Sequence, residues 1–170
     1  MTQSARHLTE VLERESADLL RYFRRRVALE DAADLLAETG MTAWRRADDL
    51  PSDSEGARRW LFTVARNTFL NYQRGQQRRL ALASRVRAVL TRADHVSPSA
   101  DDGIEVRDAI SRLPPELAEL VRLIHWDGFT IAEAAEIIGM SDTTARTRYQ
   151  RARAELRATL SATINTKSSI

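Results

Sequence analysis

The segment that most restricts the fold of this chain is TIAEAAEIIGMSDTTARTRYQRARAEL, which begins at Thr130. Thr130 and Glu133 have the spacing of a capping box, so a helix is expected to begin there. Gly139 stands where a helix often ends in a left-handed residue. Ser141 or Asp142 can then cap a second helix by accepting its first backbone N–H groups. The segment therefore predicts two helices joined by a tight turn.

Both helices of this pair have one apolar face. Residues that recur at helical spacing are expected to pack inward: Ile131, Ala134, Ala135 and Ile138 in the first helix, and Ala145, Tyr149, Ala152 and Leu156 in the second. The opposite face of the second helix carries hydroxyl, amide and guanidinium groups, namely Thr144, Arg146, Thr147, Arg148, Gln150 and Arg151.

These polar side chains suit a helix that enters the major groove of DNA. Such a helix presents its N-terminal half to base edges, and Arg and Gln can pair bidentately with guanine and adenine. Arg148, Arg153 and Arg157 are better placed for phosphates, which position a protein without specifying sequence. An ordinary helical hairpin with a solvated arginine face is the alternative. Because the small first helix, the glycine turn and the arginines occur together, the pattern favours a DNA-binding helix-turn-helix.

Composition excludes several classes of site. The chain has 170 residues, a net charge of +2 and no cysteine, so it holds no disulfide and no thiolate metal site. Its 3 histidines are scattered, no spacing indicates a catalytic triad, and no glycine loop suits a phosphate. We therefore expect no enzyme activity, no metal and no cofactor. No apolar run is long enough to span a membrane and no signal peptide is evident, so a cytoplasmic protein is expected.

Hydrophobic residues recur with helical and not with strand periodicity, so we expect an all-α chain of two small helical domains. The polar segment His95–Gly103 indicates a linker. The expected domains are 1–80 and 105–162, with a linker at 81–104 and a tail at 163–170. Within them we expect helices at 7–27, 31–47, 57–79 (continuing toward 93) and 106–113, followed by a helix opened by Pro114 and Pro115. Ser52 and Glu55 could form a capping box before the third of these helices. The residues of the first helix that are expected to face inward are Leu8, Val11, Leu12, Leu19 and Phe23.

The expected helix at 57–79 has an unusual surface. It contains no acidic residue, and its candidate contact residues are Arg59, Thr63, Arg66, Asn67, Asn71 and Arg74. Aromatic residues are interleaved with this charge, a combination that binds single-stranded nucleic acid through base stacking and backbone contacts. The alternative, favoured for Trp60 and Phe69, is that the aromatic residues pack in the core. Asn67 and Asn71 are poor helix formers, which favours contacts between their amides and unstacked bases.

Three motifs resemble the extracytoplasmic-function (ECF) sigma factors of bacterial RNA polymerase. The sequence DAADLLAE from Asp31, followed by Ala43 and Trp44, resembles their region 2.2. The sequence WLFTVARNTFLNY from Trp60 resembles their regions 2.3 and 2.4. LPPE from Leu113, together with the helix-turn-helix, resembles region 4. The motifs follow the order of the family and span nearly the whole chain.

The resemblance implies a protein that binds core RNA polymerase, through the beta-prime clamp helices and the beta flap, and promoter DNA. The helix at 31–47 would dock on the clamp helices, and the loop at 48–56, with Asn67 and Asn71, would capture a flipped base of the non-template strand at the −10 element. The helix-turn-helix would recognise the −35 element. An anti-sigma factor is a further expected partner, because the chain has no sensor motif of its own. The positions that match the docking motif are Asp34, Leu35, Glu38 and Trp44.

The residues themselves leave two other classes of protein open. A polymerase-independent DNA-binding regulator would use Met1–Leu80 for dimerisation or sensing. A helical RNA-binding or structural protein would need neither promoter nor polymerase. A sigma factor should bind core polymerase tightly and duplex DNA poorly by itself, whereas a repressor should bind its operator without polymerase.

Overall fold

The computed structural model describes residues 3–90 and 104–167 as helices and connecting turns, with no strand among them. This confirms the all-α prediction. The chain divides into two compact units, here called the N-terminal unit, up to His95, and the C-terminal unit, from Val96. The expected linker segment 95–103 lies outside the described residues.

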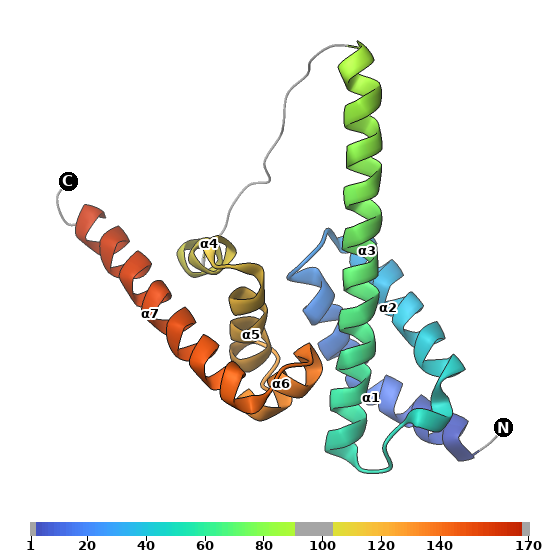
Figure 1. Cartoon of the computed structure of the whole chain (residues 1–170). Helices are drawn as coiled ribbons and strands as arrows, with labels where there is room; N and C mark the ends of the chain where they lie inside the picture. Colours follow the sequence, from blue (N-terminus) through green and yellow to red (C-terminus); the bar gives the residue numbers. More distant parts are fainter. Residues whose placement is uncertain (1–2, 91–103, 168–170) are drawn as a thin grey trace. The chain divides into compact units, whose positions relative to one another are not determined.

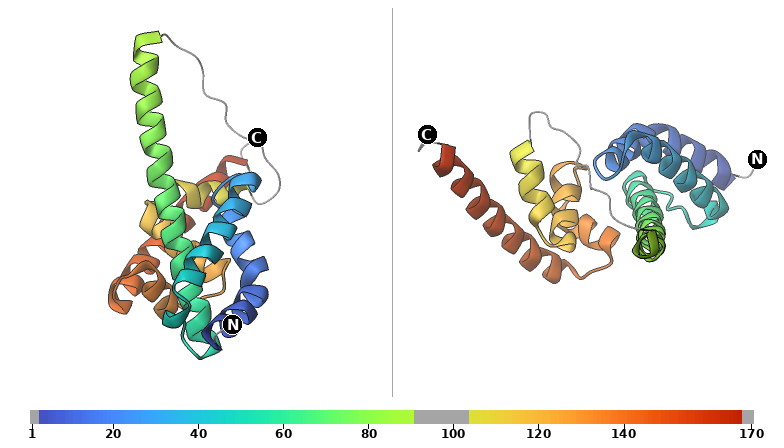
Figure 2. Two further views of the ribbon diagram at one scale, coloured as in Figure 1. Left: turned by 90° about the vertical axis from the view of Figure 1, so that its right-hand side faces the viewer. Right: turned by 90° about the horizontal axis from the view of Figure 1, so that it is seen from above.

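The N-terminal unit is built from three helices and a short 3-10 turn. They are α1 (Gln3–Arg24), α2 (Leu29–Arg45), η1 (Ala47–Asp49) and α3 (Ser54–Leu90). Each of the three long helices packs against the other two, and α3 extends beyond them in Figures 1 and 2. The helix α1 begins at Gln3, four residues before the predicted start at His7.

Aromatic rings form the centre of this unit. Tyr22 meets Phe23 and Phe62 edge to face, with ring centroids 5.2 Å and 5.6 Å apart, a favourable geometry for aromatic pairs. Leu8, Val11, Leu19 and Phe23 are buried as predicted, whereas Leu12 is only half-buried. Tyr22 was not predicted to be buried. Other buried residues are Ala32, Leu35, Thr39, Ala43, Ala57, Leu61, Val64, Ala65, Thr68 and Phe69.

A polar contact joins α2 to α3 at the edge of this core. The Tyr72 hydroxyl donates to Asp31 Oδ2 at 2.9 Å and accepts from Gln76 Nε2 at 2.9 Å. Burial, and the hydrogen bond to Asp31, raise the pKa of Tyr72. Its hydroxyl therefore remains protonated at neutral pH and can keep donating to the carboxylate.

The start of α3 corrects the predicted capping box. The helix begins at Ser54, and the backbone N–H of Gly56 donates to Asp53 Oδ1 at 2.7 Å. Asp53 therefore caps the helix, and the predicted pairing of Ser52 with Glu55 is wrong. From there α3 runs for 37 residues without a break, so the first ten residues of the expected linker, 81–90, are helical.

The C-terminal unit contains α4 (Ile104–Arg112), α5 (Pro115–His125), α6 (Ile131–Ile138) and α7 (Asp142–Lys167). The last helix includes residues 163–167, which were expected in the tail, and 168–170 lie outside the described residues. A buried cluster joins α4, α5 and α7, with Trp126 and Leu156 packed against it. Its members are Ile110, Leu113, Leu117, Ala118, Val121 and Ala152.

The predicted helix-turn-helix is confirmed in its local geometry. The Thr130 side chain accepts from the Glu133 N–H, and the Glu133 carboxylate accepts from the Thr130 N–H at 2.8 Å, completing the capping box. Gly139 has φ 82°, the left-handed conformation that glycine adopts without steric cost. Ser141 caps α7, because its Oγ accepts the Thr144 N–H at 3.2 Å. In α6 the fully inward isoleucine is Ile137, while the predicted Ile131 and Ile138 are half-buried.

Candidate nucleic-acid interfaces

The exposed face of α7 carries the predicted DNA-binding patch. Arg146, Thr147, Gln150 and Arg151 are all exposed or half-buried, and their spacing of three and four residues places them side by side on the helix. Ala145 and Ala152 are buried on the opposite side. The structure therefore brings these four side chains together. Thr144 is half-buried, and its hydroxyl lies 2.8 Å from Ser141 Oγ in the cap of the helix.

Each arginine of this patch has a carboxylate partner within the C-terminal unit. Arg146 Nε donates to Asp142 Oδ2 at 2.8 Å, and Arg151 Nε donates to Glu155 Oε1 at 2.8 Å. Arg148 pairs with Glu116 of α5. Exposed pairs of this kind contribute only about 0–1 kcal/mol. Phosphates or bases can therefore replace the carboxylates at small cost.

The position of α7 is also secured by a contact that sequence reasoning missed. His125, at the end of α5, places Nε2 2.8 Å from the Tyr149 hydroxyl, and the two rings stack with centroids 5.8 Å apart. The Arg153 guanidinium lies 5.8 Å from the centre of the Tyr149 ring. Tyr149 was expected to face inward, and it does so only in part because its hydroxyl stays at the surface. Nothing in the local sequence pairs His125 with a residue 24 positions away.

A second candidate surface follows α3. At 3.6 residues per turn its six candidate residues fall within about 140° of the helix circumference, opposite the buried side. Asn67, Asn71 and Arg74 are exposed, and the other three are half-buried. Arg74 Nη2 donates to Asn71 Oδ1 at 2.7 Å, so this acceptor is oriented before any ligand arrives. The Arg66 Nε is buried and has no hydrogen-bond partner among the described residues.

The aromatic residues of α3 belong mainly to the core. Phe62 and Phe69 are buried, which confirms the core interpretation for Phe69. Trp60 is half-buried, with the Arg46 guanidinium 5.6 Å from its ring. Base stacking on Phe62 or Phe69 is therefore excluded in this conformation. Any contact between nucleic acid and the six polar candidate residues of α3, here called the stripe, would then be made by their amide, hydroxyl and guanidinium groups.

The structure separates the loop before α3 from the two asparagines. From Ser54, the first residue of α3, the backbone rises about 20 Å to Asn67 and about 26 Å to Asn71, at ~1.5 Å per residue. The expectation that the loop at 48–56 and both asparagines hold one flipped base stays a prediction, although this rise favours separate contacts for the start of α3 and the asparagines.

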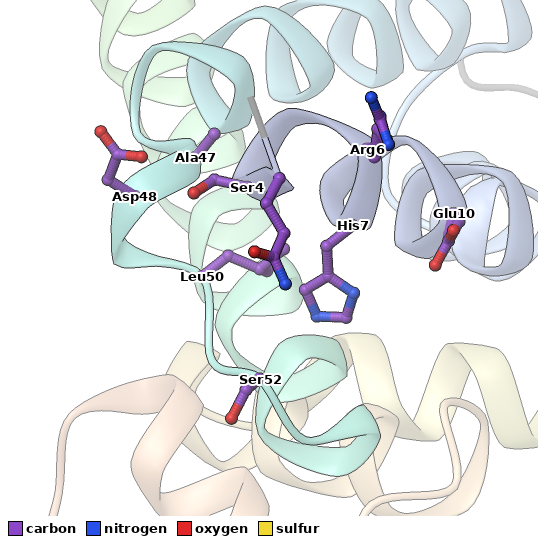
Figure 3. Close-up of a pocket in the computed structure, with 9 residues that line it drawn as sticks. Ser4, Arg6, His7, Glu10, Ala47, Asp48, Leu50 and Ser52 are labelled. Atoms are coloured by element: carbon purple, nitrogen blue, oxygen red, sulfur yellow. The ribbon is translucent and has the colours of Figure 1, made fainter. Parts of the chain in front are cut away.

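A pocket separates this loop from α1. Its volume is about 530 Å³, and Figure 3 shows Ser4, His7 and Glu10 of α1 on one side and Asp48, Leu50 and Ser52 on the other. His7 bridges the two sides, with Nε2 3.1 Å from the carbonyl oxygen of Pro51. The pocket is open to solvent, whereas the 3-10 turn η1 at the start of the loop packs against α1.

The predicted docking residues of α2 do not all reach the surface. Asp34 and Glu38 are exposed, and Trp44 is 49% exposed. Leu35 is only 2% exposed and packs in the core, so we correct its assignment: it supports the helix and offers no contact surface. Met41, which was not predicted, is 55% exposed on the same face as the other three. An exposed apolar surface framed by carboxylates is typical of a protein-binding site.

No cluster of three or more His, Asp or Glu side chains in the described parts of the chain could hold a metal ion. Among the described helices, none is long and apolar enough to cross a membrane.

Two family models match the chain, one in each unit. The sigma-70 region 2 model matches residues 11–79, and the sigma-70 region 4 model matches residues 104–156. The ECF RNA polymerase sigma factor EcfG of Rhodopseudomonas palustris is 31% identical over 129 residues, covering 76% of this chain and 71% of the relative. SigL of Mycobacterium tuberculosis, another ECF sigma factor, is 29% identical over 132 residues, covering 76% of this chain and 74% of SigL.

Solved structures of similar proteins include complexes. The sigma factor RpoE from Bartonella quintana, solved with the anti-sigma factor NepR, has a TM-score of 0.66 and 27% identity, covering 92% of this chain and 95% of RpoE. CnrH, solved with the cytosolic domain of CnrY, has a TM-score of 0.65 and 25% identity, covering 94% of each chain.

Proposed function

Because this chain belongs to the ECF sigma factors of RNA polymerase, we propose that its two units divide the recognition of a promoter between them. The protein directs promoter-specific initiation of transcription by RNA polymerase and, like its family, is not an enzyme. The observation that carries the proposal is that regions 2 and 4 match the two units in chain order. The alternative of a polymerase-independent regulator is not supported, because the region 2 match covers the residues that such a regulator would use for dimerisation or sensing.

The C-terminal unit recognises the −35 element through α7. Arg146, Thr147, Gln150 and Arg151 contact base edges in the major groove, while Arg148 contacts a phosphate. Support comes from the four residues lying together on one face and from the weak carboxylate pairs that DNA can displace. Thr144 contributes indirectly by helping to cap α7, because its hydroxyl lies 2.8 Å from Ser141 Oγ.

The N-terminal unit recognises the −10 element at two places. The loop at 48–56 captures a flipped base of the non-template strand, and the stripe on α3 contacts the same strand farther along. The stripe consists of Arg59, Thr63, Arg66, Asn67, Asn71 and Arg74. The length of α3 between loop and asparagines supports this division. Such contacts need an unpaired base, so they act after the closed complex has formed.

Core polymerase binds the exposed face of α2. Asp34, Glu38 and Trp44 face the clamp helices of the beta-prime subunit, and Met41 extends the apolar part of that surface. The exposure of two large apolar side chains between carboxylates supports this assignment. The beta flap is the second polymerase contact, through the C-terminal unit.

An anti-sigma factor regulates the chain by covering the face of α2. The motivation is that RpoE was solved with the anti-sigma factor NepR. Pull-down from the native host under non-inducing conditions should recover a stoichiometric protein that competes with core polymerase. Free protein whose activity follows only its synthesis would contradict this regulation.

In vitro transcription with purified core polymerase tests the promoter assignments. Arg146→Ala with Arg151→Ala should weaken use of the −35 element, at about 1–3 kcal/mol of discrimination for each lost bidentate contact, and should leave polymerase affinity unchanged. Arg107→Ala, at an exposed position on α4 outside the recognition helix, is the matched arginine control. Trp44→Ala should instead lower the affinity for core polymerase. Tight binding of duplex DNA by the chain alone, with no transcription upon adding polymerase, would reject the whole proposal.

A further inference from the structure

The middle of the loop between α2 and α3 is tied to a distant helix. At one end of the loop, Arg46 pairs with Asp49 at 3.0 Å, and at the other end Asp53 caps α3. Between these ends the solvent-open pocket of about 530 Å³ separates the loop from α1. There His7, 44 residues away in sequence, reaches the carbonyl of Pro51 at 3.1 Å. The ring lies beside the loop in Figure 3.

The chemistry of the contact between His7 and Pro51 determines which atom donates the hydrogen bond. A carbonyl oxygen only accepts hydrogen bonds, so Nε2 of His7 must carry the proton and donate. Pro51 has no N–H, and its carbonyl is therefore its only hydrogen-bonding group. No described peptide bond is cis, and in a planar trans peptide the carbonyl and the following N–H point in opposite directions. By holding the Pro51 carbonyl, His7 turns the Ser52 N–H away from α1.

We propose that His7 is a positioning residue for base recognition: its hydrogen bond to Pro51 holds the loop so that the Ser52 N–H and the outer loop face meet a flipped nucleobase. The inference rests on the proposed role of the loop at the −10 element. His7 does not touch the base. It acts by limiting the conformations of the part of the loop that borders the open pocket, which lowers the cost of ordering the loop when a base binds.

Open-complex formation on a promoter series tests this role. The four bases are placed in turn at the −10 position that the loop recognises, and rates are measured with core polymerase and each full-length variant. His7→Ala should reduce the ratio between preferred and other bases by roughly two- to tenfold, as expected for one hydrogen bond. His7→Gln retains an N–H donor and should restore the ratio at least in part. Glu10→Gln, which lines the same pocket from α1, should match the wild type.

Hydrogen exchange of the loop peptides gives a readout that does not depend on DNA. Exchange at 47–53 should be faster in His7→Ala than in His7→Gln, with equal exchange in the core of the N-terminal unit. Equal discrimination in His7→Ala and wild type would reject the role of His7 and leave the loop as a base reader. Absence of any base preference in the wild type would reject the loop proposal, and the role of His7 with it.

Discussion

Glu15 carries a charge into the core of the N-terminal unit, where it is 5% exposed. Its two carboxylate oxygens accept from Arg14 Nε at 2.8 Å and from Arg58 Nε at 3.1 Å. Arg58 also lies 3.5 Å from Asp18 and places its guanidinium 5.0 Å from the centre of the Phe62 ring. Glu15 thereby joins α1 to α3. A buried charge is tolerated only when it is paired in this way.

Glu15→Ala should destabilise the N-terminal unit by roughly 2–3 kcal/mol, below the 3–5 kcal/mol typical of a broken buried pair, because Asp18 still pairs with Arg58. Urea unfolding measures the change. Glu13→Ala, an exposed carboxylate on the same helix, should stay within about 0.5 kcal/mol of the wild type. Equal destabilisation by Glu15→Ala and Glu13→Ala would show that the buried ion pair contributes no more to stability than an exposed carboxylate does.

Two glycines of the N-terminal unit should respond in opposite ways to alanine. A Cβ at Gly40, inside α2, would meet no atom within 4 Å, so Gly40→Ala should stabilise by about 0.5–1 kcal/mol through helix propensity. A Cβ at Gly56 would lie 2.6 Å from Asp53 Oδ2 and 3.0 Å from the Pro51 Cβ, so Gly56→Ala should disturb the cap and destabilise. Thermal unfolding gives the sign of each change, and a stabilising Gly56→Ala would refute the close packing of the loop.

At the scale of elements, α3 would set the spacing of the contacts that we propose at the −10 element. It is one helix of 37 residues, with the loop at its start and the asparagines about 20–26 Å farther along. A helix is stiff over this length, so the two zones keep a constant separation. The same helix supplies much of the core through Leu61, Phe62 and Ala65.

This spacing predicts that loop variants and asparagine variants affect different promoter positions. Asn67→Ala with Asn71→Ala should still recruit polymerase, but should lower the permanganate reactivity of −10 thymines because contacts to the opened strand are lost. Ser52→Pro removes the backbone N–H of residue 52, which we propose faces the flipped base. This variant should change the base preference at a promoter position several nucleotides away from those that the asparagine variants affect. The same promoter position affected by both variants would contradict the separation along α3, and full opening in the double asparagine variant would reject the stripe as a strand contact.

At the scale of the whole molecule, the two compact units have separate cores. The N-terminal core is centred on Tyr22, Phe23 and Phe62, and the C-terminal cluster on Leu117, Val121 and Ala152. Cooperative unfolding follows a shared core. Two cores should therefore unfold in two steps.

Calorimetry should resolve two transitions, each shifted by variants in its own unit. Glu15→Ala should lower only the N-terminal transition. Gly139→Ala should lower only the C-terminal one, by about 1–2 kcal/mol, because an alanine is strained in the left-handed conformation. In a Trp126→Phe background, fluorescence reports only Trp44 and Trp60, which identifies the N-terminal transition. A single transition lowered by both variants would show that the units unfold together.

The local geometry of the helix-turn-helix follows from the sequence alone. The capping box at Thr130, the left-handed Gly139 and the polar α7 patch depend on residues within about four positions of each other. Interactions of that range follow from helical spacing and backbone preference. For the same reason helical periodicity is sufficient to predict the all-α class and the outward face of Asn67 and Asn71.

Contacts between distant residues depend instead on how the helices pack. Leu35 belongs to the docking motif, yet the packing of α2 turns it into the core while neighbouring Asp34 faces out. The link between His7 and Pro51 spans 44 residues, and that between Glu15 and Arg58 spans 43. Side chains so far apart in sequence meet only after the helices pack, and spacing along the chain does not determine which helix faces meet each other.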